Sequence, residues 1–256
     1  MRYLETVMGI PMSIDVRDRA ESSIAARRAF RILGEADRRF SAYRSDSELS
    51  RINASGGDLT AASEEFREVV ALGSATAEAS GGAFRIRLPD GTWDLDGVVK
   101  GWAADRAARE LTACGLADYC LNAGGDVAVS GSPGEGRPWN VAVRSPDSAA
   151  EVLAVLSVTG GAVATSGAYE RGAHIVDGRT GVAADSLTSA TVVADDLTTA
   201  DLLATAVFAL GPSGAAWAVS HGARGVLVAG TDGSLLGAGE LVFASSSASA
   251  SAGRLR

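Results

Sequence analysis

Short apolar or alternating segments and longer segments with helical spacing follow one another along the chain. The short segments predict strands at 12–17, 119–121, 127–129, 139–143, 152–158, 190–194 and 226–228. Apolar residues at helical spacing predict helices over 20–40, 61–80, about 102–113 and 197–211. Because strands and helices are mixed without strict alternation, we expect an α+β fold of mostly antiparallel or mixed sheets flanked by helices.

Turn and cap signals refine these boundaries. Met8 and Gly9 predict a turn before the first strand, and Asp46 is a candidate cap for a short helix. We expect residues 1–244 to form a single domain. Residues 245–256 are rich in Ser and Ala and lack core residues, so we expect a flexible tail.

The charge and hydropathy of the chain argue against some classes of binding partner. The 256 residues carry a formal net charge of −8, which argues against nucleic acid or an anionic membrane surface as the main partner. No apolar run is long enough to span a membrane, and the first residues show no signal peptide, so we expect a cytoplasmic protein. The two cysteines, Cys114 and Cys120, are too few for a disulfide framework and are expected to be reduced thiols.

The helix that ends at Gly211 and Pro212 carries a candidate cation site. Asp201 and Thr205 lie four residues apart, so a helix places their carboxylate and hydroxyl on one face. Such oxygens suit Mg²⁺. Taken alone, the simpler interpretation is that Asp201 serves the helix dipole and Thr205 bonds to its own backbone.

Two glycine-containing segments could approach a phosphate. Residues 94–101 precede a predicted helix, where backbone amides and the helix dipole favour an anion, and Lys100 adds a positive charge. The alternative is an ordinary strand-to-helix connection with a solvated Lys100. The pair Gly124-Gly125 within 122–126 permits close backbone approach or, equally, a plain hairpin turn.

The chain contains two histidines. His174 lies near acids and an arginine in the sequence, and histidine is the side chain best suited to accept a proton near neutral pH. A structural role for His174 remains open. His221, before Gly222, fits the end of a helix.

Several of these segments, in this order, resemble the ApbE family of flavin transferases (FAD:protein FMN transferases). The resemblance runs from about residue 5 to 240 and rests on Met8-Gly9, 41–53, 94–101 with Asp105, 122–126, 165–167 with Tyr169 and Arg171, 174–177 with 179–181, and Ala200-Asp201 with Thr205.

The resemblance implies a Mg²⁺-dependent enzyme that cuts FAD, passes FMN to a Thr or Ser hydroxyl of an acceptor flavoprotein and releases AMP. It implies that Asp201, Thr205 and the Gly97 carbonyl hold the metal. It assigns the flavin nucleotide to Met8, Tyr43, Ala83, Phe84, Asp94, Lys100 and Ile175. His174 matches the family's histidine and is our candidate base, helped by Asp177.

The chain departs from the family pattern near the pocket. The family's Ala-Phe-Asp is replaced by Ala83-Phe84-Arg85, and the connection from there to Asp94 is short. Two other hypotheses stay open. One is a Mg²⁺-dependent FAD pyrophosphatase that gives FMN and AMP, and the other is a non-catalytic flavin-binding protein.

Overall fold

The structure is a computed structural model that describes residues 1–18, 22–146, 148, 150–167 and 175–244. Its centre is an eight-stranded sheet in which every pair of neighbouring strands is antiparallel. In spatial order the strands are β1 (Arg2–Val7), β2 (Ile10–Val16), β3 (Tyr119–Ala123), β4 (Asp126–Ser130), β7 (Gly161–Gly167), β10 (Leu187–Ala194), β11 (Ala223–Gly230) and β12 (Leu235–Gly239).

Two small hairpins accompany the large sheet. They are β5 (Trp139–Arg144) with β6 (Val152–Val158), and β8 (Val176–Asp177) with β9 (Val182–Ala183). The prediction of an α+β fold with mostly antiparallel sheets is therefore confirmed.

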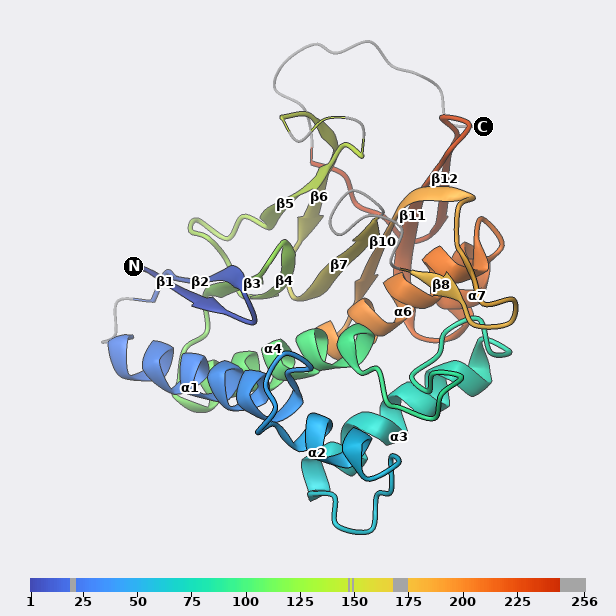
Figure 1. Cartoon of the computed structure of the whole chain (residues 1–256). Coiled ribbons are helices and arrows are strands. Elements are labelled where there is room, and N and C mark those ends of the chain that lie inside the picture. The colour runs from blue at the N-terminus through green and yellow to red at the C-terminus, as the bar shows by residue number, and fades with distance from the viewer. Residues whose placement is uncertain (19–21, 147, 149, 168–174, 245–256) are drawn as a thin grey trace.

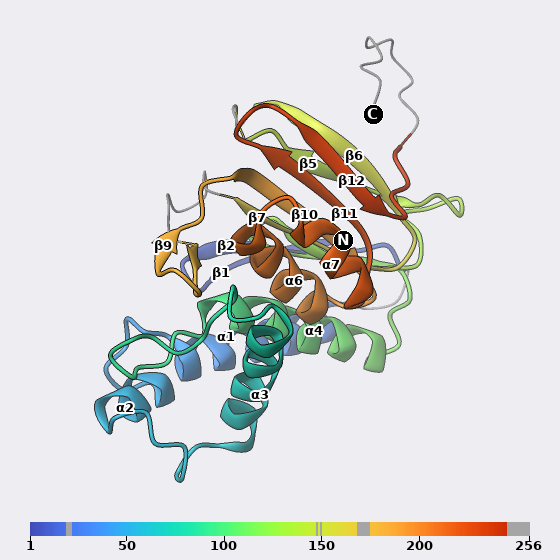
Figure 2. The same ribbon diagram turned by 90° about the vertical axis from the view of Figure 1, so that its right-hand side faces the viewer.

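The helices lie on one side of the large sheet, and the β5–β6 hairpin lies on the other (Figures 1 and 2). Within the described residues the helices are α1 (Ser23–Phe40), α2 (Glu48–Ala54), α3 (Glu64–Ala79), α4 (Asp96–Ala113), α6 (Leu197–Leu210) and α7 (Gly214–Ser220). Helix α4 packs between α1 and α6, while α2 and α3 lie farther from the sheet (Figure 2).

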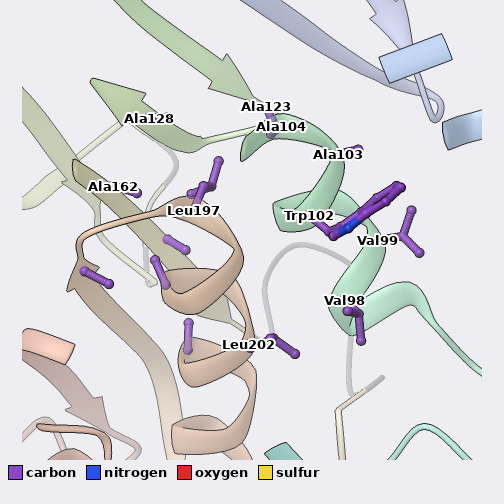
Figure 3. Close-up of a cluster of buried hydrophobic side chains, with 14 of the residues drawn as sticks. Val98, Val99, Trp102, Ala103, Ala104, Ala123, Ala128, Ala162, Leu197 and Leu202 are labelled. Atoms are coloured by element: carbon purple, nitrogen blue, oxygen red, sulfur yellow. The ribbon is translucent and has the colours of Figure 1, made fainter. Parts of the chain in front are cut away.

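Side-chain size differs between the two faces of the sheet. Successive residues of a strand point to opposite faces. On the central strands Ala128 and Ala162 belong to the core beneath the helices, whereas Val127, Val129 and Val163 pack against the β5–β6 hairpin. Figure 3 shows these alanines in one cluster with buried residues of α4 and α6, among them Ala104 and Leu197. Small side chains on this face let both helices come close to the sheet.

Most predicted elements are present, with three differences. Strand β1 was not predicted. Ser47, not Asp46, caps α2, because its hydroxyl accepts from the Ser50 amide, and the Asp46 carboxylate instead pairs with Arg44. Helix α4 begins at Asp96, so residues 96–101 are its first turns and do not form a separate loop as predicted.

The predictions for one turn, one helix end and the two cysteines are confirmed. Met8 and Gly9 form a two-residue turn with φ values of 54° and 72°, and α6 is followed by Gly211 at φ 75°. Both cysteines are free thiols. Within the described residues, no helix is long and apolar enough to cross a membrane. The predicted tail, 245–256, falls outside the described residues.

Candidate functional site

A cavity of about 550 Å³ lies where the start of α4, the end of β7 and the middle of α6 meet. This volume is within the range typical of small-molecule sites. Eight of the residues predicted for the site line it: Ala83, Phe84, Asp94, Gly97, Lys100, Ile175, Asp201 and Thr205. Segments far apart in the sequence are thus brought together around one hollow.

Of the remaining predicted residues, those that the structure describes do not line this cavity. Met8 lies in the β1–β2 turn, partly buried against the core, and the next strand's Ile10 reaches the cavity wall. Tyr43 is 96% exposed. His174 falls outside the described residues. Asp177 lies in β8, next to Val176, which does line the cavity.

Asp201 is held where α6 crosses α4. Its side chain is buried, and its Oδ2 accepts a hydrogen bond of 2.9 Å from the Gly101 amide. The helices touch here: a Cβ on Gly101 would lie 2.6 Å from the Asp201 Cβ and 2.7 Å from the Leu197 carbonyl oxygen. Only glycine fits at position 101, and its amide fixes the orientation of the Asp201 carboxylate.

The same hydrogen bond affects Gly97. In an α-helix the amide of residue 101 is directed at the carbonyl of residue 97. Because Asp201 competes for that amide, the Gly97 carbonyl is better able to accept another partner. Gly97 is also close to α6, since a Cβ there would lie 3.6 Å from the Thr205 Cγ2.

Thr205 completes this group of oxygens one turn after Asp201. Its Oγ1 lies 3.1 Å from the Oγ of Ser166 on β7, and both residues line the cavity. The predicted juxtaposition of Asp201 and Thr205 on one helical face is therefore present, and the face is turned toward the cavity.

Lys100 lies between two buried carboxylates. Its Nζ is 2.5 Å from Oδ2 of Asp126 and 3.4 Å from Oδ1 of Asp201. Burial raises the pKa of Asp201 to about 6, and the Lys100 ammonium opposes this rise. Two acids and one base leave the cluster with a surplus of negative charge.

Asp177 is engaged by Arg179. The Arg179 Nη2 donates to the Asp177 Oδ2 over 2.7 Å, and the Nε donates to Oδ1 over 2.9 Å. These hydrogen bonds hold the pKa of Asp177 below its ordinary value. The carboxylate therefore stays charged and is a weak proton acceptor near neutral pH.

Sequence reasoning assigned no role to several residues at the cavity. Asp126 forms the ion pair with Lys100, Ser166 contacts Thr205, and Arg85 and Arg144 line the wall. Asp126 carried a usable signal, since an acid directly after a Gly-Gly turn and at the start of a strand is placed at a sheet end.

The oxygens at this site suit a hard cation. Asp201, Thr205 and Gly97 offer a carboxylate, a hydroxyl and a backbone carbonyl, the ligand types that Mg²⁺ prefers. Within the described part of the chain, no three His, Cys, Asp or Glu residues gather as a metal site. A cation here would therefore depend on the hydroxyl and carbonyl oxygens as well as on Asp201.

Comparison with known proteins identifies the family of this chain. The model of the ApbE family matches residues 8–92 and 86–227. A protein of Rhodobacter capsulatus named FAD:protein FMN transferase is 38% identical over 173 residues, which cover 63% of this chain and 32% of that protein. A protein of the same name from Escherichia coli K12 is 37% identical over 135 residues, which cover 49% of this chain and 38% of that protein.

The chain thus spans about a third of the length of these curated relatives. Solved structures match more of it. The ApbE protein of Thermotoga maritima superposes with a TM-score of 0.82 at 24% identity, covering 92% of this chain and 96% of that one. Flavin transferase ApbE from Vibrio cholerae gives 0.78 at 23% identity, covering 94% and 96%. The structures confirm the fold, and the family match, which spans most of the sequence, shows that the chain belongs to the ApbE family.

Proposed function

We propose that the protein is a Mg²⁺-dependent transferase that moves FMN from FAD to a Thr or Ser hydroxyl of an acceptor flavoprotein and releases AMP. The observation that carries the proposal is the convergence of Asp201, Thr205 and Gly97 on one cavity, beside Lys100. The shared name of the R. capsulatus and E. coli relatives supports the same activity.

In this proposal Asp201, Thr205 and the Gly97 carbonyl hold the cation. When bound, Mg²⁺ supplies positive charge that offsets the negative charge of a dinucleotide's phosphates. Lys100 adds a second positive charge at the same wall. The Asp201 carboxylate is already oriented by the Gly101 amide, so little reorganisation is needed on binding.

The remaining cavity residues are assigned to the nucleotide. Phe84, Ala83 and Ile175 are buried and give an apolar wall suited to a ring system, while Asp94 offers a hydrogen-bond acceptor. Met8 and Tyr43 are proposed contacts outside the cavity wall; at 96% exposure, the Tyr43 ring is free to stack on a ligand.

The proposed group transfer is a single displacement at the FMN phosphorus. The acceptor hydroxyl oxygen forms a bond to the FMN phosphorus, the phosphoanhydride bond breaks, and AMP departs with the bonding electron pair. The hydroxyl proton goes to His174, our proposed base. Asp177 stays charged through Arg179, so it is suited to orienting or stabilising the protonated base rather than to taking the proton itself.

The test uses the purified protein with FAD, Mg²⁺ and a candidate acceptor that carries an FMN-attachment Thr or Ser. We expect the acceptor to gain the mass of FMN, with AMP released in equal amount, and chelation of the metal to stop both. AMP and free FMN without a labelled acceptor would instead support the FAD pyrophosphatase. FAD binding without AMP release would support the non-catalytic flavin-binding protein.

His174→Ala tests the proposed base. Because general-base help is worth roughly 10²–10⁴-fold, transfer should slow by about this factor while FAD still binds. Retention of the wild-type transfer rate would remove His174 from the mechanism.

A further inference from the structure

Asp126 is a buried acid whose two oxygens have different partners. It begins β4 directly after the Gly124-Gly125 turn and is 3% exposed. Its Oδ1 accepts the Thr165 amide of β7 over 2.8 Å, close to where the pairing of β4 with β7 ends. The side chain is therefore fixed to the sheet on one side.

The second oxygen of Asp126 is committed to Lys100. The Lys100 Nζ lies 2.5 Å from Asp126 Oδ2 as its ion-pair partner, and no other donor among the described residues bonds to this oxygen. A buried carboxylate oxygen is costly unless a charge or a donor compensates it. The ammonium of Lys100 supplies that compensation.

Lys100 is also within reach of the proposed metal ligand, since its Nζ lies 3.4 Å from Asp201 Oδ1. An ammonium that settled fully on Asp201 would occupy the carboxylate that the cation needs. The structure shows the ammonium nearer to Asp126 than to Asp201, by 2.5 Å against 3.4 Å.

We propose that Asp126 is a positioning residue that holds the Lys100 ammonium away from Asp201, and so keeps the Asp201 carboxylate available to the divalent cation. This inference rests on the proposed function. In this role Asp126 acts on metal binding through Lys100 and does not contact the cation itself.

Asp126→Asn is the central variant. An Asn oxygen can still accept the Thr165 amide, but a neutral amide no longer holds the ammonium, which should then pair with Asp201. We expect the affinity for Mn²⁺, a paramagnetic substitute for Mg²⁺ measured by electron paramagnetic resonance without FAD, to fall by about tenfold or more.

A double-mutant cycle separates this role from a simple loss of negative charge. In the Lys100→Gln background no ammonium can cover Asp201, so adding Asp126→Asn should change Mn²⁺ affinity by less than about threefold. An equal loss of affinity in both backgrounds would mean that Asp126 acts on the cation directly by its charge, and would overturn the inference.

Two further variants guard against a general loss of structure. Asp105→Asn, which changes a buried acid outside the cavity wall, is the matched control and should leave Mn²⁺ affinity unchanged. If circular dichroism shows that Asp126→Asn does not fold, the cycle is repeated with Asp126→Ser, whose smaller side chain adds no steric conflict and cannot reach Lys100.

The inference and the proposed function fail in different ways. If Asp201→Ala does not reduce Mn²⁺ affinity, the proposed metal site is wrong. If Asp201→Ala abolishes Mn²⁺ binding but Asp126→Asn leaves it unchanged, the metal site stands and the role of Asp126 is wrong.

Discussion

Two buried carboxylates lie on the contact between α4 and α6, and they differ in how their charge is compensated. Asp201 of α6 is 4% exposed and accepts the Gly101 amide of α4, while Asp105 of α4 is 6% exposed and accepts the Thr198 hydroxyl of α6 over 3.4 Å. Each carboxylate thus links the two helices: Asp201 extends from α6 to a donor on α4, and Asp105 extends from α4 to a donor on α6.

Burial and an adjacent cavity are common to Asp201 and Asp105, so neither feature distinguishes them. Asp105 borders a second cavity, of about 370 Å³, and burial raises its pKa as it raises that of Asp201. The difference is charge balance. Asp105 has its own partner, Arg109, whereas Asp201 and Asp126 share Lys100. The surplus of negative charge marks the Asp201 end as the end suited to a cation.

The largest expected effect is on the rate of FMN transfer, measured when Asp201 and Asp105 are each replaced. Asp201→Ala should lower FMN transfer by about 10³-fold or more, because it removes the one carboxylate proposed to hold the metal. Asp105→Ala should leave the transfer rate within about threefold of wild type, because Asp105 lies outside the proposed site. Covalent flavin on the acceptor, measured by mass spectrometry, gives both rates. Equal losses in the two variants would show that the charge comparison has no functional meaning.

The next effect concerns the close contact that orients Asp201. Gly101→Ala places a methyl group 2.6 Å from the Asp201 Cβ, so we expect the free energy of unfolding to fall by about 1–3 kcal/mol. Gly34→Ala, in α1, is the matched control. Its added Cβ has only the Arg38 Nη1 nearby, at 3.6 Å, and should stabilise the helix by about 0.5–1 kcal/mol.

Urea denaturation measures both changes. A stabilising effect of Gly101→Ala would show that the helices tolerate a wider separation, and that the close contact with α6 is not the reason for glycine at this position.

The smallest effect is a pH dependence at Asp105. Burial raises the pKa of Asp105 above its ordinary 3.8, so the folded protein binds this proton more tightly than the unfolded chain does. The cost of the buried charge is present above the folded pKa and is relieved as pH falls through it toward 3.8. Wild type should therefore gain stability relative to Asp105→Asn as pH is lowered from neutral toward 4.5.

Urea denaturation of wild type and Asp105→Asn at several pH values measures this difference. If the stability of wild type relative to Asp105→Asn stays constant, or decreases, as the pH is lowered, Arg109 compensates the carboxylate fully.

The sequence predicted best what depends on local spacing. The four-residue interval between Asp201 and Thr205 was sufficient to place both on one face, and Gly211 ended the helix as expected. The start of α4 was misplaced because two glycines and two valines within 97–101 are poor helix formers. Packing of α4 against α6 at Gly101 outweighs that local preference.

Other features depend on tertiary contacts that spacing does not encode. Strand β1 lies at the edge of the sheet with most side chains exposed, so it lacks an alternating pattern. The ion pair of Lys100 with Asp126 joins a helix to a strand, and no local pattern predicts which acid the single lysine of the chain meets. The resemblance named Lys100, but the partner emerged only from the fold.

The hydrogen bond from Gly101 to Asp201 joins residues separated by 100 positions. Contacts at such separation form only after much of the chain has been made and has closed a long loop. A nascent chain that ends before α6 therefore lacks the proposed cation site, whatever structure its earlier helices have reached. The gain of metal affinity during refolding would then report the joining of α4 and α6.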